Sequence, residues 1–311
     1  MAVPWFVDPH WDSELCEVPW SIRLEGFNME IVATGDFDFD QSISSRARQA
    51  VRVDLSETTH VSLYNLVAMA CALMRGREDG RDLTFKPPRD PSVCNFLSRL
   101  GFDDFTSDVI GLDCALGISA DSKAPSDVLV DIRTFESSSD LTPLQNLLWD
   151  KLDEVAPARL AMFDEALVEL VANVTEHSHG QGLVAAVVQA ERRADSHIDL
   201  VIGDSGIGIR ESFLSRPDCG RFPATDHEAI TLALEYLVSS VPGDKGRGQG
   251  LTTTVESALA LEGRVVIRSG SARRIMYREQ GIKGQPGAER AKPTSVPNLS
   301  GTIVAVRVPC R

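Results

Sequence analysis

Apolar and polar positions divide the chain into segments with two different spacings. In the first 140 residues, apolar runs predict strands at 29–37, 50–55 and 82–88. Apolar residues with helical spacing predict helices at 60–75 and 91–102. Strands and helices follow one another in turn, so we expect a small α/β layer in this part of the chain.

The rest of the chain carries a second set of predicted elements. Helical spacing is found at 142–155, 163–180, 226–240 and 250–263, and strand-like runs lie at 182–191, 197–206, 264–269, 272–279 and 301–309. Residues 280–300 contain three glycines and three prolines, and they are predicted to form a mobile loop. We expect an α/β domain in which helices cover a sheet.

The predicted boundary between the two parts lies near residue 140. Residues 118–127 are polar and contain Pro125, which is typical of a linker. The strand-like run at 128–135 could belong to either part. The expected domains are therefore residues 1–140 and 141–311, and a length of 311 residues suits two domains.

Composition narrows the class of protein. The net charge of −14 argues against nucleic acid as the main partner, because nucleic-acid binders are usually basic. The first residues have neither a basic head nor an apolar run, so no signal peptide is expected, and no stretch approaches the roughly 20 consecutive apolar residues of a membrane span. Six scattered cysteines without a CxxC pair indicate reduced thiols. These features predict a cytoplasmic protein without a membrane contact.

One helical stretch, "FDEALVELVANVTEHSHG", carries an unusual polar row. Glu169, Asn173 and His177 recur at intervals of four, so they share one helix face. A solvated polar stripe would explain the row equally well from this helix alone. A row that faces a ligand is the alternative, and two later motifs favour it.

The first of these motifs is "VIGDSGIGI". An apolar strand leads into Asp204, whose carboxylate can accept a hydrogen bond from an exocyclic amine. Gly206 and Gly208 follow, and glycine allows a backbone to approach a flat ligand closely. This motif alone is a weak signal, because many corners between a strand and a turn look like it.

The second motif is "DKGRGQGLTTT". Gly246, Gly248 and Gly250 alternate and lead directly into a predicted helix. Backbone N–H groups of such a loop, with a helix N-terminus behind them, suit phosphate groups. Lys245 and Arg247 add positive charge. A flexible loop without a ligand is the alternative interpretation.

The order of the motifs resembles the GHKL superfamily, which includes gyrase, heat-shock chaperones, histidine kinases and MutL. ExxxN, DxGxG, GxGxGL and a final "GT" at Gly301–Thr302 appear in this order, and the resemblance covers roughly 145–309. It implies a Bergerat fold, a layer of helices over a mixed sheet, which binds ATP with Mg²⁺. One amide oxygen suits Mg²⁺, which prefers a few hard oxygen ligands with phosphates and water.

The resemblance also implies roles for individual residues. Glu169 would orient or activate the attacking nucleophile, Asn173 would be the Mg²⁺ ligand, and Asp204 would hold the adenine amino group. His177 would lie near the phosphates or the ribose, although a structural or exposed histidine is an equal alternative. Residues 210–245 would form the lid over ATP. The remaining nucleotide-binding positions would be Gly206, Gly208, Lys245, Gly246, Arg247, Gly248, Gly250, Leu251 and Thr302.

The helix "ELVANVTEHSHG" is more similar to that of anti-sigma-factor serine kinases than to gyrase or MutL. A sensor histidine kinase is disfavoured, because neither His10 nor His60 has the setting of a phosphoacceptor. The first part of the chain resembles a STAS domain. Its phosphorylatable serine motif is not retained, since "SLYNL" places Leu63 and Tyr64 where serines would be. A generic α/β scaffold remains the alternative for this part.

Three functions follow as hypotheses. The chain is a regulatory ATP-binding protein, with a kinase-like or nucleotide-switched module joined to a degenerate STAS-like domain that acts on a protein partner. Alternatively, it is an ATPase that couples hydrolysis to lid closure and homodimerisation. The third hypothesis is a nucleotide-binding pseudo-enzyme, which the presence of both Glu169 and Asn173 disfavours. An enzymatic activity would be ATP hydrolysis or serine/threonine phosphorylation of the anti-sigma type.

Overall fold

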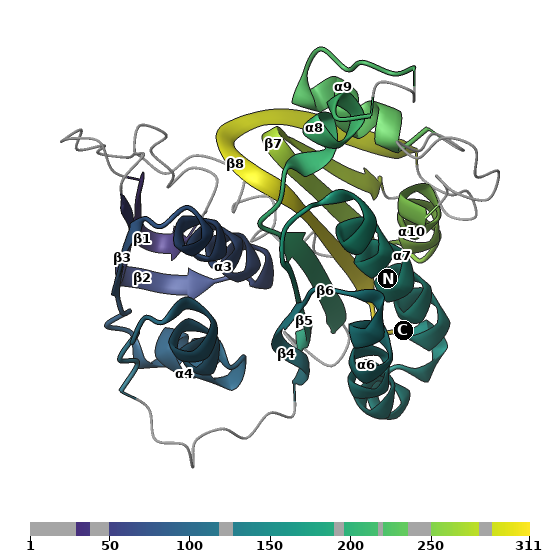
Figure 1. The fold of residues 1–311 in the computed structure, drawn as a ribbon. Helices are drawn as coiled ribbons and strands as arrows, with labels where there is room; N and C mark the ends of the chain where they lie inside the picture. The colour runs from purple at the N-terminus through teal and green to yellow at the C-terminus, as the bar shows by residue number, and fades with distance from the viewer. Residues whose placement is uncertain are drawn as a thin grey trace.

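The computed structural model describes residues 29–37, 50–117, 127–189, 196–216, 220–235, 250–279 and 288–311. Helices and strands are mixed along the chain and form two sheets, which confirms the α/β class (Figure 1). We call residues up to 117 the N-terminal part and residues from 127 the C-terminal part. The centre of the expected linker, 118–126, lies outside the described residues.

The N-terminal part contains a parallel sheet in the order β1 (Met29–Phe37), β2 (Ala50–Val61) and β3 (Asp82–Lys86). Helix α3 (Leu63–Glu78) returns the chain between β2 and β3, as a parallel pair requires. Helix α4 (Pro91–Arg99) follows, and the Asp90 carboxylate caps it by accepting from the Ser92 amide at 2.8 Å. Short helices α5 (Phe102–Asp104) and η1 (Phe105–Ile110) complete this part.

The C-terminal part contains five strands in the order β4–β5–β6–β8–β7. Their bounds are β4 (Val128–Phe135), β5 (Gly182–Gln189), β6 (His197–Asp204), β7 (Arg264–Arg278) and β8 (Glu289–Pro309). The run at 128–135 could belong to either part by its sequence, and the expected boundary near residue 140 left it in the first; it is the edge strand of this sheet. All four pairings are antiparallel, so the mixed sheet expected from the family resemblance is not found here. Parallel pairing is confined to the N-terminal sheet.

Helices α6 (Leu141–Val155), α7 (Leu160–His177) and α10 (Gly250–Ala260) cover one face of the five-stranded sheet (Figure 1). Short turns η3 (Ser138–Asp140) and η4 (Pro157–Arg159) precede α6 and α7. Helices α8 (Gly208–Leu214) and α9 (Asp226–Ala233) follow β6 and lie against β7. Apart from the last strands, the expected helices and strands are therefore present, with shifted ends.

Two expectations about the last strands are wrong. The runs at 264–269 and 272–279 form one strand, β7, whose register shifts at Gly270, where φ is +58°. Residues 289–300 are not a loop, because β8 begins at Glu289 and pairs with β7. Among the described residues this stretch pairs with β7 alone, and a strand with one open edge tolerates Pro293 and Pro297. Residues 280–287 lie outside the described part.

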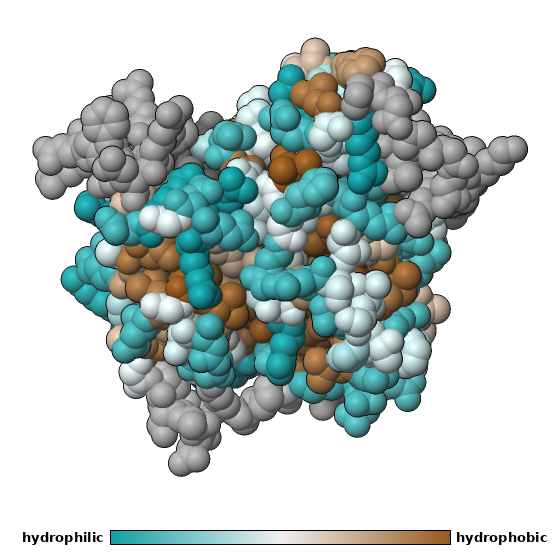
Figure 2. Space-filling view, viewed as in Figure 1, coloured by the Kyte–Doolittle hydropathy of each residue, from teal (hydrophilic) through white to brown (hydrophobic). Residues whose placement is uncertain are grey.

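Helix α3 lies between the two sheets. Thirteen of its sixteen residues are buried, including Leu66, Met69 and Leu73. They share one hydrophobic cluster with residues of the five-stranded sheet such as Leu183 and Val201. The sheet is thus covered on both faces, by α3 on one and by α6, α7 and α10 on the other. In Figure 2, hydrophilic residues separate the apolar patches seen on one face of the molecule.

In the described part of the chain, every helix is too short or too polar to span a bilayer.

Candidate functional site

The polar row on α7 lies at the border between core and solvent. Glu169, Asn173 and His177 are each half-buried, while Leu170 and Val174 on the same helix are buried in the core. Among the described residues, the side chains of Glu169 and Asn173 have no hydrogen-bond partner. Helix α7 is amphipathic and packs on the sheet through its apolar face, so the polar row lies along the border of that buried face.

The start of α10 packs directly against this row. A methyl group on Gly250 would overlap the Glu169 carboxylate and lie 2.9 Å from the Glu169 Cβ, so only glycine allows this approach. The first N–H groups of a helix have no partner within the helix and attract anions. Leu251, the next residue, is half-buried against the core. Four further predicted positions lie outside the described residues: Lys245, Gly246, Arg247 and Gly248.

Asp204 ends strand β6 and is buried, with 3% of its surface exposed. Its Oδ1 accepts from the Gly206 amide at 2.8 Å, and its Oδ2 accepts from the Thr302 amide at 3.1 Å. The structure therefore brings together Asp204 and Thr302, which lie 98 positions apart in the sequence. Each carboxylate oxygen keeps a second lone pair for a ligand.

The pKa of Asp204 is raised to about 7, chiefly by burial. The two backbone hydrogen bonds oppose this rise, and the charge of Glu78 contributes a smaller part of it. The carboxyl group consequently changes charge near neutral pH. Such a shift in a buried carboxyl group is frequent at functional sites, although structural sites show it too.

The two glycines after Asp204 have different roles. Gly206 lies against the carbonyl group of Ser178, where a methyl group would overlap the oxygen and lie 2.6 Å from the carbon. Gly208 has a φ of +79° and lies beside Ser269, whose Oγ accepts from the Ile209 amide at 2.9 Å. Both glycines are therefore required by the fold of residues 204–208, which we call the Asp204 corner, with or without a ligand.

Ser269 is a site residue that the sequence analysis missed. Its Oγ lies 3.2 Å from the Thr302 Oγ1 and also bonds the start of α8. The half-buried Thr302 and the buried Ser269 thus stand side by side next to Asp204. The sequence around Ser269 contains no motif. Its only indication in the sequence is its position just before Gly270, between two strand-like apolar runs.

Helix α7 connects the two groups of residues. Its C-terminal end, at His177 and Ser178, reaches the Asp204 corner, because the Ser178 carbonyl accepts from the Ile207 amide at 2.8 Å. Glu169 and Gly250 lie at the other end of the row, about 12 Å away along the helix axis. The arrangement suits an elongated ligand with chemically different ends. The expected lid, 210–245, is described only in part, through α8 and α9.

Burial raises the pKa of Glu169, and the nearby charges of Glu165 and Glu176 add to the effect. A carboxylate with a raised pKa is a stronger base than a free one. Asn173, one turn further along α7, supplies a neutral amide oxygen.

No protein-family model matches the chain, and no curated protein matches it either. The assignment of the site therefore depends on the residues and contacts described above.

The raised pKa of Asp204 predicts how stability depends on pH. An ionised Asp204 costs the folded state free energy, so stability falls as pH rises from about 4 to about 7. Asp204→Asn lacks this charge. Between pH 5 and 8, we expect the unfolding free energy of Asp204→Asn to rise by about 3 kcal/mol relative to wild type. Urea denaturation of both proteins at these two pH values measures the difference, and a constant difference would contradict the buried charge.

Proposed function

We propose that the C-terminal part binds ATP with Mg²⁺ and that the chain is a nucleotide-controlled regulatory protein of the GHKL type, acting on a protein partner. The proposal is carried mainly by one observation. A buried carboxylate, Asp204, lies at one end of the α7 row, and a helix N-terminus at Gly250 lies at the other end. ATP requires both features. Its adenine amino group needs a hydrogen-bond acceptor, and its phosphates need N–H donors.

The adenine end is supported by the corner around Asp204. Its ionised carboxylate accepts from an exocyclic amino group, and the Thr302 hydroxyl beside it can bind a bridging water. Gly206 and Gly208 allow the close backbone packing that holds this turn in place, so that the Asp204 carboxylate and Thr302 stay in position for a flat ring.

The phosphate end is supported by Glu169, Asn173 and the start of α10. Asn173 would hold Mg²⁺ through its amide oxygen, with phosphate oxygens and water as the other ligands. The N–H groups at the start of α10 would face the phosphates, and Lys245 and Arg247 of the preceding segment would add positive charge. The bound metal would supply charge neutralisation on the phosphates.

Glu169 would then take a proton. Its half-buried carboxylate, with a pKa above the ordinary value, would accept the proton of a water or of a partner hydroxyl as that oxygen attacks the terminal phosphate. The bond from the terminal phosphorus to the bridging oxygen would break, and ADP would leave. Attack by water gives an ATPase, and attack by a serine or threonine gives a protein kinase.

The same Glu169 base also supports an alternative, an ATPase that couples hydrolysis to lid closure and homodimerisation. ATP turnover measured with and without candidate partner proteins separates the two. Turnover that depends only on the concentration of the chain itself supports the ATPase. Label transferred to a partner supports the kinase.

The adenine assignment predicts a loss of affinity in Asp204→Asn. An asparagine presents an NH₂ group where one carboxylate oxygen accepts, so ATP and ADP should bind at least about tenfold more weakly at pH 8. Isothermal titration calorimetry with ATP, ADP and GTP measures this, and GTP should show a smaller change. Asp164→Asn is the control, since Asp164 on α7 instead accepts from Gln145 and Trp149. Equal ATP affinity in Asp204→Asn and wild type would refute the assignment.

A further inference from the structure

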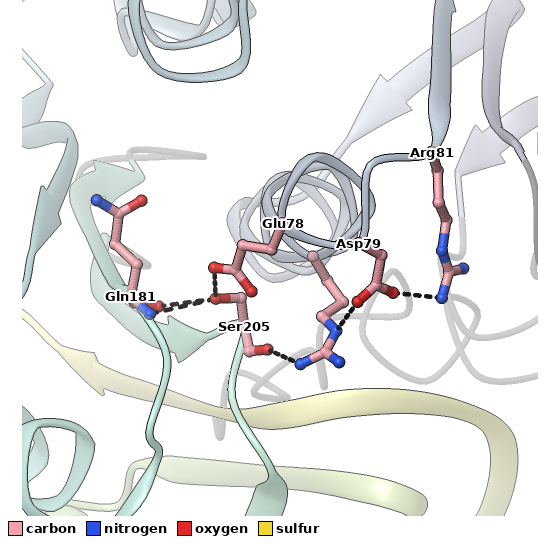
Figure 3. A network of polar contacts seen from close by, with 6 residues as sticks. Glu78, Asp79, Arg81, Gln181 and Ser205 are labelled. Carbon is pink, nitrogen blue, oxygen red and sulfur yellow. Dashed lines mark hydrogen bonds and ion pairs between the residues drawn. The ribbon is translucent and has the colours of Figure 1, made fainter.

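The end of α3 reaches the Asp204 corner from the opposite face of the sheet. Figure 3 shows Glu78, the last residue of the helix, beside Ser205 of the C-terminal part, with Gln181 on the other side of Ser205. Ser205 is fully buried and stands between Asp204 and Gly206 in the chain. A residue of the N-terminal part thus contacts the centre of the proposed adenine-binding motif.

The contacts to Ser205 come from both parts of the chain. Its Oγ donates to the Glu78 Oε1 at 2.5 Å, and its carbonyl oxygen accepts from the Arg75 guanidinium at 3.4 Å. Arg75 is itself paired with Asp79 at 3.0 Å. On the other side, Ser205 exchanges hydrogen bonds with Gln181, whose carbonyl accepts from the Ser205 amide at 3.1 Å. Every polar group of Ser205 is therefore engaged.

A second contact lies two turns before Glu78 on α3. Cys71 packs on Gly203, where a methyl group would lie 2.8 Å from the sulfur. Gly203 and Ser205 precede and follow Asp204 in the chain, and both contact α3. Helix α3 therefore holds the backbone on each side of Asp204.

Electrostatics link the same residues. The charged and titratable groups that act on this corner from α3 are Glu78, Arg75 and Cys71, and burial keeps the Cys71 thiol neutral by raising its pKa. Strand β7 contributes Arg268, which acts on Cys71. On the opposite face, α7 and the turn after it carry His177 and His179. Among these, the Glu78 carboxylate is the group that raises the pKa of Asp204.

We propose that Glu78 is a positioning residue for the adenine-binding corner, so that the N-terminal part sets the nucleotide affinity of the C-terminal part within one chain. The inference rests on the proposed ATP binding. Glu78 fixes the Ser205 hydroxyl, Ser205 fixes the turn from Asp204 to Gly206, and this turn aims the carboxylate at the ligand. A partner that moved the end of α3 would change ATP affinity without touching the nucleotide.

Two substitutions separate the effect of the Glu78 hydrogen bond on ATP binding from the effect of the Glu78 charge. Glu78→Ala removes the hydrogen bond and should weaken ATP binding at pH 8 by about tenfold. Glu78→Gln keeps an acceptor but loses the charge, so it should bind ATP better than Glu78→Ala. In Glu78→Gln the pH midpoint of ATP binding should fall by roughly half a unit, because Asp204 stays ionised to lower pH. A purely structural role would leave this midpoint unchanged.

Glu57→Gln is the matched control. Glu57 lies on β2 of the same part and is exposed, and it pairs with Arg89, which is not among the residues that bond Ser205. Calorimetry at pH 6 to 8 gives affinities and midpoints for all four proteins. We expect Glu57→Gln to match wild type in both.

A measurement without nucleotide keeps the inference testable if ATP does not bind. Amide hydrogen exchange of residues 203–209 should be faster in Glu78→Ala than in Glu57→Gln and wild type. Wild type that fails to bind ATP would refute the proposed function, and exchange would then decide whether Glu78 holds this turn. ATP binding with unchanged affinity, midpoint and exchange in Glu78→Ala would overturn the positioning role alone.

Discussion

Gly206→Ala is expected to destabilise the protein by about 4 kcal/mol or more. A methyl group at this position would overlap the Ser178 carbonyl oxygen, which is backbone and cannot rotate away. Relief would require the turn after α7 to separate from the corner after β6, and this would break the hydrogen bond from the Ile207 amide to Ser178. Urea denaturation, followed by circular dichroism, measures the loss.

Gly80→Ala is the control for this substitution. Gly80 has a φ of +65°, and nothing lies within 4 Å of the position that its Cβ would occupy. The cost should therefore be only that of a left-handed conformation, about 1–2 kcal/mol. Similar losses in the two variants would mean that the close contact between residues 178 and 206 is absent in solution.

Glu169→Gln is expected to lower ATP hydrolysis or phosphate transfer at least about a hundredfold. Glutamine has nearly the same shape but cannot accept a proton at neutral pH. ATP affinity should stay within about threefold, because in the proposed assignment the phosphates would be held by the α10 N-terminus rather than by this carboxylate. Release or transfer of radioactive γ-phosphate gives the rate, and calorimetry gives the affinity.

Glu165→Gln tests whether the effect belongs to position 169. Glu165 lies one turn earlier on α7 and is exposed, and its charge contributes to the raised pKa of Glu169. This variant should keep its maximal rate and shift the pH dependence of that rate slightly to lower pH, because losing a neighbouring negative charge lowers the pKa of Glu169. Wild-type turnover in Glu169→Gln would show that another group is the base.

Most of the fold follows from local patterns in the sequence. Strands β5 and β6 could be predicted because "GLVAAVVQ" and "HIDLVIGD" are nearly continuous apolar runs. The same runs also indicate that both faces of the sheet are covered, because strands of a sheet with one solvent-exposed face alternate apolar and polar residues. Helix α3 is likewise apolar on all sides, which is typical of a buried helix. The pairing of residues 289–300 could not be predicted, because their prolines resemble a loop.

The candidate site was predictable only where residues form motifs. Asp204 and Gly250 belong to short motifs in which glycine recurs at every second position, and such motifs can be recognised from the sequence alone. Glu78 and Ser205 lie 127 positions apart, and neither has a distinctive neighbourhood in the sequence. Their contact depends on how two sheets stack around α3, and stacking of this kind is decided by the whole core rather than by any segment.

The burial of α3 between two sheets also constrains how such a chain can change over generations. A domain that touches its neighbour only through a linker can be exchanged for another by recombination, because each keeps a polar outer surface. Here Leu183 and Val201 would face water if the N-terminal part were replaced, and α3 would lose one of its two supporting sheets. Inheritance should therefore keep the two parts together, and substitutions on either side of α3 should accumulate as matched pairs.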